Sequence, residues 1–83
     1  MTKHTHRFVE EFDGFVGFGF DREGDENTLT YYLQKLSDDE CMALIRERIS
    51  QGDMEELFDL LTRLLKTNLA EEEYHKVFLK EDK

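Results

Sequence analysis

Residues 53–66 read DMEELFDLLTRLLK, and this stretch decides the fold of the chain. At about 100° per residue, its apolar side chains fall within an arc of about 160° of a helix. These residues are Met54, Leu57, Phe58, Leu60, Leu61, Leu64 and Leu65, and the remaining positions from Glu55 to Lys66 are polar. A stripe of this width contacts more than one neighbour, so the helix is either the centre of the core or shared with another chain.

The sequence on the N-terminal side of this stretch predicts two more short helices. Ser37 and Glu40 have the spacing of a capping box, which opens a helix that Gly52 ends. Its inward residues are Met42, Ile45 and Ile49. The helix before it is capped by Asn27 or Thr28, and its stripe has i, i+3, i+4, i+7 spacing: Leu29, Tyr32, Leu33 and Leu36.

Asp53 is the predicted N-cap of the leucine-rich helix, and a fourth helix is predicted after it. Asn68 and Glu71 repeat the capping-box spacing before it. Its apolar side carries Tyr74, Val77 and Phe78. We therefore expect a single domain over residues 1–83 of mainly α (α+β) class, with a helical bundle at residues 28–80.

The N-terminal segment, HRFVEEFDGFVGFGFD (residues 6–21), differs in composition from the rest of the chain. Asp13–Gly14 between two apolar runs predicts a β-hairpin over residues 5–22, because a tight hairpin turn needs positive φ angles. The alternative is a short helix over residues 5–12 with Phe8 and Phe12 on one side, which gives an all-α chain with an N-terminal arm. The polar stretch Asp21–Asn27 reads as a linker.

Composition excludes several classes of protein. The 83 residues include 20 acidic and 11 basic side chains, so the net charge is −9, which disfavours direct binding to nucleic acid or anionic lipid. A single cysteine, Cys41, excludes an internal disulfide. No apolar run approaches the roughly 20 residues of a membrane span, and the N-terminus has no signal-peptide core. We expect a soluble cytoplasmic protein.

A chain of this size, without a disulfide or metal site, buries barely enough apolar surface to offset its lost conformational entropy. The broad leucine stripe and the Phe-rich segment therefore predict a protein–protein interaction module, either a homodimer or the partner of another protein, with a regulatory or accessory role. The predicted partner-binding residues are Phe15, Phe18, Phe20, Tyr31, Leu60 and Leu64. No catalytic motif is present, so we expect no enzyme activity and no cofactor.

Two other functions stay open. The acidic residues could imitate nucleic acid and inhibit a DNA-binding protein, although their clusters fall in the first turns of predicted helices, where the helix dipole favours them. Removal of Met1 would leave an N-terminus with His4 at its third position, a square-planar Cu(II) or Ni(II) ligand set that His6 could join. Cys41 has no histidine nearby to act as a base, and it is expected to be buried and inert.

Overall fold

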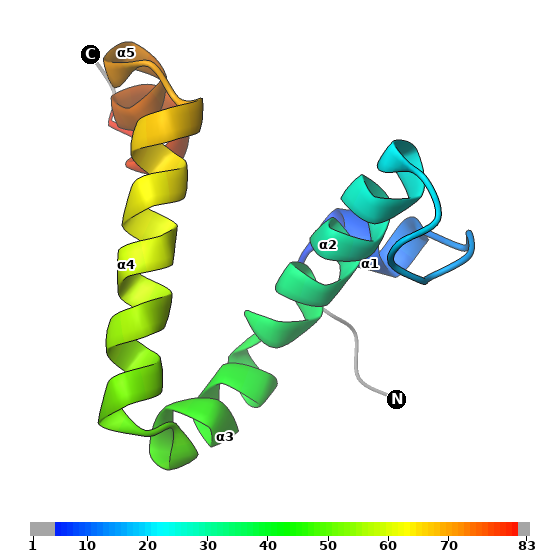
Figure 1. Ribbon diagram of the computed structural model, residues 1–83, viewed down its shortest axis with the longest axis horizontal. Helices are drawn as coiled ribbons and strands as arrows, with labels where there is room; N and C mark the ends of the chain where they lie inside the picture. The colour runs from blue at the N-terminus through cyan, green and yellow to red at the C-terminus, as the bar shows by residue number, and fades with distance from the viewer. Residues whose placement is uncertain (1–4, 82–83) are drawn as a thin grey trace. The chain divides into compact units, whose positions relative to one another are not determined.

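The computed structural model describes residues 5–81, and this part of the chain is helical without a strand. It contains α1 (Arg7–Glu11), α2 (Arg22–Leu36), α3 (Asp39–Arg48), α4 (Gln51–Asn68), α5 (Glu71–Glu73) and a short π-helix, η1 (Tyr74–Phe78) (Figure 1). The chain divides into two compact units, Met1–Arg48 and Ile49–Lys83. The mainly helical class is confirmed, in its all-α form.

The β-hairpin predicted over residues 5–22 is wrong, because its first strand is helix α1. Phe8 and Phe12 lie one helical turn apart, and their rings stack with centroids 5.1 Å apart. Phe12 also meets the edge of Tyr31 in α2, at 6.0 Å between ring centroids. The backbone N–H of Val9 donates to Oε1 of Gln34, 3.0 Å away, and Val9 is buried. Packing against α2 thus outweighs the local preference of Asp-Gly for a turn.

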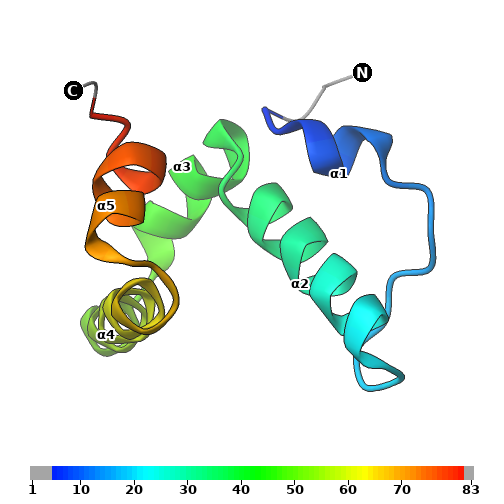
Figure 2. The same ribbon diagram turned by 90° about the horizontal axis from the view of Figure 1, so that it is seen from above.

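After α1 the chain forms an irregular loop that returns to the start of α2 (Figure 2). Asp13–Gly14 lies in this loop and does not join two strands. A Cβ at Gly14 would lie 2.7 Å from the Phe12 ring, so the absence of a side chain there lets the loop pass close to that ring. We call residues 13–20 the aromatic loop.

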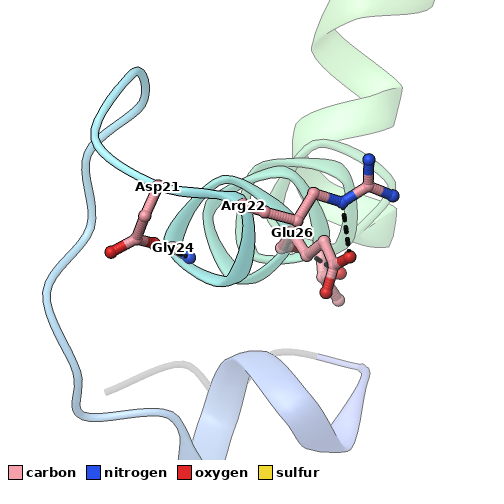
Figure 3. Close-up of polar contacts among 5 residues, drawn as sticks. Asp21, Arg22, Gly24 and Glu26 are labelled. Atoms are coloured by element: carbon pink, nitrogen blue, oxygen red, sulfur yellow. Dashed lines mark hydrogen bonds and ion pairs between the residues drawn. The ribbon is translucent and has the colours of Figure 1, made fainter.

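The predicted linker Asp21–Asn27 is also wrong, since these residues cap and form the first turns of α2. Asp21 is the N-cap, and its Oδ1 accepts a hydrogen bond from the backbone N–H of Gly24 at 2.6 Å (Figure 3). Arg22, the first helical residue, donates a hydrogen bond from its Nε to Glu26 Oε2, one turn further along the helix, at 2.6 Å. This hydrogen bond, together with the negative charge of Glu26, raises the pKa of the Arg22 guanidinium. The N-cap of the helix therefore lies six residues before Asn27 and seven before Thr28, the two predicted caps.

Replacing Asp21 with alanine is expected to lower the free energy of unfolding by about 1 kcal/mol, the usual cost of losing an N-cap hydrogen bond. Urea denaturation followed by circular dichroism measures this loss. Asp21→Asn keeps an oxygen acceptor and is the control, with an expected loss of under about 0.5 kcal/mol. An equal loss in both variants would show that the charge of Asp21, and not its hydrogen bond, stabilises α2.

Thr5 and His6, which precede α1, form hydrogen bonds to residues between α2 and α3. Ser37 is the C-cap of α2, so it does not open α3 as predicted; Asp38 takes that place, with its Oδ1 3.4 Å from the N–H of Glu40. The other carboxylate oxygen of Asp38 accepts from the N–H of Thr5 at 2.8 Å. His6 Nε2 lies 2.9 Å from Ser37 Oγ. The segment before α1 is thus tied to the end of α2 by side-chain hydrogen bonds.

Helix α4 starts and ends at different residues from those predicted. Its N-cap is Ser50, whose Oγ accepts from the N–H of Asp53 at 3.1 Å, so Asp53 is not the cap. Gly52 lies inside the first turn of α4 and does not end α3. At the other end, Asn68 is the last helical residue and its Nδ2 donates to a backbone oxygen of α4.

The capping hydrogen bond of the last helical segment forms two residues after the predicted position. The N–H of Ala70 donates to Glu73 Oε1 at 2.8 Å, so the expected Asn68–Glu71 pair is wrong. In η1 the N–H of Leu79 reaches the carbonyl of Tyr74 at 2.9 Å, the i→i+5 bond of a π-helix. The rings of Tyr74 and Phe78 stack with centroids 5.4 Å apart. In Figure 1 the α5–η1 segment folds back against the C-terminal end of α4.

Buried side chains belong to the first unit. Among residues 5–81, only Val9 and Thr28 are buried, and both lie where α2 contacts α1 or the aromatic loop. In the second unit the least exposed side chains are half-buried: Ile49, Thr62, Leu65, Leu69 and Tyr74. The second unit therefore leaves most of its apolar surface in contact with solvent.

Candidate functional site

The apolar stripe of α4 lies exposed along the second unit. Its seven residues follow the predicted spacing on one helix. They are Met54, Leu57, Phe58, Leu60, Leu61, Leu64 and Leu65. Six of them are 40–69% exposed, and Leu65 is half-buried. An exposed Leu or Phe is common by itself, whereas a continuous row of them on one helix face forms an extended apolar patch.

One side of the stripe forms a groove with the end of the chain. The groove has a volume of about 760 Å³ and lies between α4 and the α5–η1 segment. It is lined by Phe58, Leu61, Thr62, Leu65, Lys66, Leu69, Glu71, Tyr74 and Phe78. The stacked pair Tyr74 and Phe78 forms its far wall. The end of the chain therefore covers this side of α4 in part.

The other side of the stripe has no cover from its own unit, and we call it the open face. It consists of Leu57, Leu60 and Leu64, which are 40–42% exposed. None of these three residues lines the groove. Leu60 and Leu64, two of the predicted partner-binding residues, lie on the open face. Leu57 completes it, and its place in the same stripe is the sequence signal that identifies it.

A second exposed apolar surface lies in the first unit. Three aromatic residues of the aromatic loop are 68–74% exposed: Phe15, Phe18 and Phe20. The rings of Phe15 and Phe20 contact each other edge to face, at 5.5 Å between centroids. The structure thus brings together two of the three phenylalanines that the sequence singled out, on a loop and not on a strand.

The aromatic loop is fixed by hydrogen bonds to α2. Thr28 Oγ1 accepts from the N–H of Gly17 at 3.0 Å and donates to the carbonyl oxygen of Gly17 at 2.9 Å. The N–H of Gly19 donates to Asp25 Oδ1 at 2.7 Å. Gly19 has a φ angle of 100°, which glycine adopts without strain. A single buried hydroxyl, that of Thr28, therefore satisfies both backbone groups of one loop residue.

Tyr31 is not part of the exposed aromatic surface. It is half-buried, with its ring against Phe12 and with Lys35 Nζ 5.2 Å from the ring centroid. Its contacts belong to the packing of α1 on α2. The residues predicted to bind a partner therefore lie in three places: the aromatic loop, the α1–α2 contact and the open face of α4.

The residues considered for metal binding or catalysis are not brought together. His4 lies outside the described residues, and His6 makes the hydrogen bond to Ser37 described above. Cys41 is half-buried and has a free thiol. The remaining histidine, His75, has its Nδ1 2.7 Å from Glu81 Oε1. Within residues 5–81, no three or more His, Cys, Asp and Glu side chains are grouped so that they could hold a metal ion.

No helix in the described part of the chain is both long enough and apolar enough to cross a membrane. Comparison of the sequence and structure with protein-family models, with curated proteins and with solved structures finds no match. The site must therefore be interpreted from its own geometry.

Proposed function

We propose that this chain is a protein–protein interaction module with a regulatory or accessory role, which binds through the open face of α4 and has no catalytic activity of its own. The observation that carries the proposal is the 40–42% exposure of three leucine side chains along one side of an 18-residue helix. Burying a leucine side chain fully stabilises a complex by about 1.5–3 kcal/mol. Because these leucines are 40–42% exposed, covering them with another helix gains the corresponding part of this energy, about 1 kcal/mol each.

The shape of the open face favours a helix as the occupant. Its residues are spaced at i, i+3 and i+7, which follows one side of α4 for about two turns. A helix packs its own side chains between residues spaced in this way, at a distance of about 8–10 Å between axes. We propose that α4 of a second copy of the chain binds to the open face.

The aromatic loop supports an interaction role independently. Its phenylalanines are the most exposed large apolar residues of the first unit, and the loop that carries them is held by Thr28 and Asp25. A fixed loop loses little conformational entropy on binding, which favours recognition. Aromatic residues are also enriched in protein interfaces.

The two other predicted functions have weaker support. Several of the acidic residues lie in the first turns of α3 and α5, where the helix dipole stabilises them without any partner. Imitation of nucleic acid is therefore not needed to explain their placement. Copper or nickel binding at His4 and His6 stays a prediction, since it depends on the chain before residue 5.

Light scattering of the purified chain over a concentration series tests the proposal. From about 1 μM to about 1 mM, which covers the dissociation constants of weak to moderate complexes, we expect the average mass to rise from 9.9 kDa towards twice that value. A mass of 9.9 kDa at every concentration would contradict self-association. Binding of an unidentified protein from a cell extract would not replace this result.

A further inference from the structure

The charged residues of α4 are segregated along its length. The N-terminal half carries the acidic residues, Asp53, Glu55, Glu56 and Asp59, and the C-terminal half carries the basic ones, Arg63 and Lys66. A helix dipole favours acidic residues only in the first turn, and Glu56 lies beyond it. The segregation therefore calls for a second explanation.

One acidic and one basic residue lie at the free edge of the open face. At about 100° per residue, Glu56 and Arg63 both project within about 60° of Leu60, on the side away from the groove. Both side chains are exposed, and within residues 5–81 neither makes an ion pair. The two residues are seven positions apart, so they cannot reach each other on one helix.

We infer that two copies of the chain pair through the open faces of α4 in an antiparallel orientation, with Leu60 near the twofold axis. This inference rests on the proposed function. In an antiparallel pair, equivalent edges of the two helices meet. Glu56 of one copy then faces Arg63 of the other, and the symmetry repeats the pair. The midpoint between residues 56 and 63 coincides with the middle of the open face.

The apolar and polar positions of α4 agree with the same register. With the twofold axis near residue 60, Leu57 of one copy packs beside Leu64 of the other. Asp53 at the start of α4 comes opposite Thr67 and Asn68 at its end, so polar residues meet polar residues. A shift by one heptad would place Asp53 against an apolar residue, at the cost of burying a carboxylate without a partner.

A parallel pair does not satisfy these charges. In that orientation the Glu56 edge of one helix lies against the opposite edge of the other, where Phe58 and Leu61 begin the groove. Glu56 would then face Leu61 and Arg63 would face Asn68, so neither side chain would gain an opposite charge. The antiparallel orientation is therefore favoured by charge as well as by packing.

Single charge reversals test the inference. Glu56→Lys and Arg63→Glu each turn two attractive contacts of the dimer into two repulsive ones, and we expect each to weaken the dimer about tenfold. Glu56→Lys also reduces the net charge from −9 to −7, which by itself would strengthen association, so a weaker dimer cannot come from overall charge. The combined variant Glu56→Lys/Arg63→Glu restores both pairs at the original net charge, and its dissociation constant should return to within about threefold of the wild-type value.

Glu55→Lys is the matched control. Glu55 lies on the far side of α4 from Leu64, where its carboxylate accepts a hydrogen bond from Gln51 Nε2 at 3.0 Å, so its reversal should not weaken the dimer. Sedimentation equilibrium gives the dissociation constants, and circular dichroism confirms that each variant keeps its helix content.

A distance measurement tests the orientation directly. Spin labels on Gln51→Cys, in a Cys41→Ser background, should be separated by about 27 Å along the helix axes of an antiparallel pair centred on residue 60, and should lie at the same height in a parallel pair. Labels at equal height, or a combined variant as weak as the single reversals, would overturn the antiparallel pairing. If such a dimer still depended on Leu57 and Leu64, the proposed function would stand. A wild-type chain that is monomeric throughout would remove both.

Discussion

Replacing Leu57 and Leu64 together with glutamine is expected to weaken self-association at least about 100-fold, because covering the 40–42% of each leucine that is exposed contributes about 1 kcal/mol. Both side chains lie on the open face, and neither lines the groove beside α5 and η1. In a symmetric pair the double variant removes four leucines from the interface. Glutamine has a helix propensity close to that of leucine, so α4 itself should persist.

Sedimentation velocity of the double variant, compared with the wild type at equal concentrations, measures this effect. Asp59→Gln is the control, since residue 59 lies on the polar side of α4 and its substitution should leave the dissociation constant within about threefold. A double variant that dimerises as well as the wild type would show that α4 is not the interface. The aromatic loop, with Phe18→Ser as the first variant, would then be the surface to test.

The largest expected effect on stability concerns Thr28. Thr28→Val keeps the shape of the side chain and removes its hydroxyl, which leaves the N–H and carbonyl of Gly17 without their partner. An unsatisfied, partly buried polar group costs about 1–3 kcal/mol, so we expect the free energy of unfolding of the first unit to fall by about 2 kcal/mol. Amide hydrogen exchange of α1 and α2 residues measures the loss within that unit.

Thr30→Val provides the comparison for Thr28→Val. Thr30 Oγ1 donates to the carbonyl of Glu26 in the same helix, and loss of this local bond should change stability by under about 0.5 kcal/mol. The exchange rate of the Gly17 amide should increase in the Thr28 variant alone. Equal effects of the two substitutions would mean that the aromatic loop does not depend on Thr28.

The helical parts with strong periodicity could be predicted from the sequence, and their ends could not. The stripe from Met54 to Leu65 predicts α4 because seven apolar positions agree with one helix face. Its start depends on whether Ser50 or Asp53 caps the helix, and both are good caps. The structure uses Ser50, which places Gly52 in the first turn of α4.

The N-terminal segment was predicted wrongly because its structure depends on distant residues. Asp13–Gly14 is a strong local signal for a hairpin, whereas α1 is stabilised by Gln34 and Tyr31, which lie 25 and 19 positions after Val9 and Phe12. Such contacts cannot be read from local spacing. The polar stretch after Phe20 forms helix for a related reason: Asp21 caps the helix with its own side chain, and Gly24 supplies the N–H that it binds.

The candidate site could be predicted in part. Leu60 and Leu64 follow from the width of the stripe, which implies more than one neighbour. The division of that stripe into a groove and an open face follows from the return of η1 beside α4, with Tyr74 and Phe78 stacked against the groove. A π-helix has no clear sequence signal, so this division could not be foreseen. The sequence places Tyr31 among the partner-binding residues because its contact with Phe12 forms only in the folded chain and cannot be read from local spacing.

Few side chains of the second unit are covered, so in the proposed pair the stability of α4 depends on the concentration of the protein. An isolated helix of about 15 residues is only marginally stable in water, and here α5 and η1 shield one side of it alone. In the proposed pair, the second copy supplies the missing cover, so folding and assembly of residues 51–68 become one equilibrium. Dilution of the protein then lowers the folded fraction of α4, and a higher concentration raises it. The folding of this half of the molecule therefore responds to the cellular concentration of the protein.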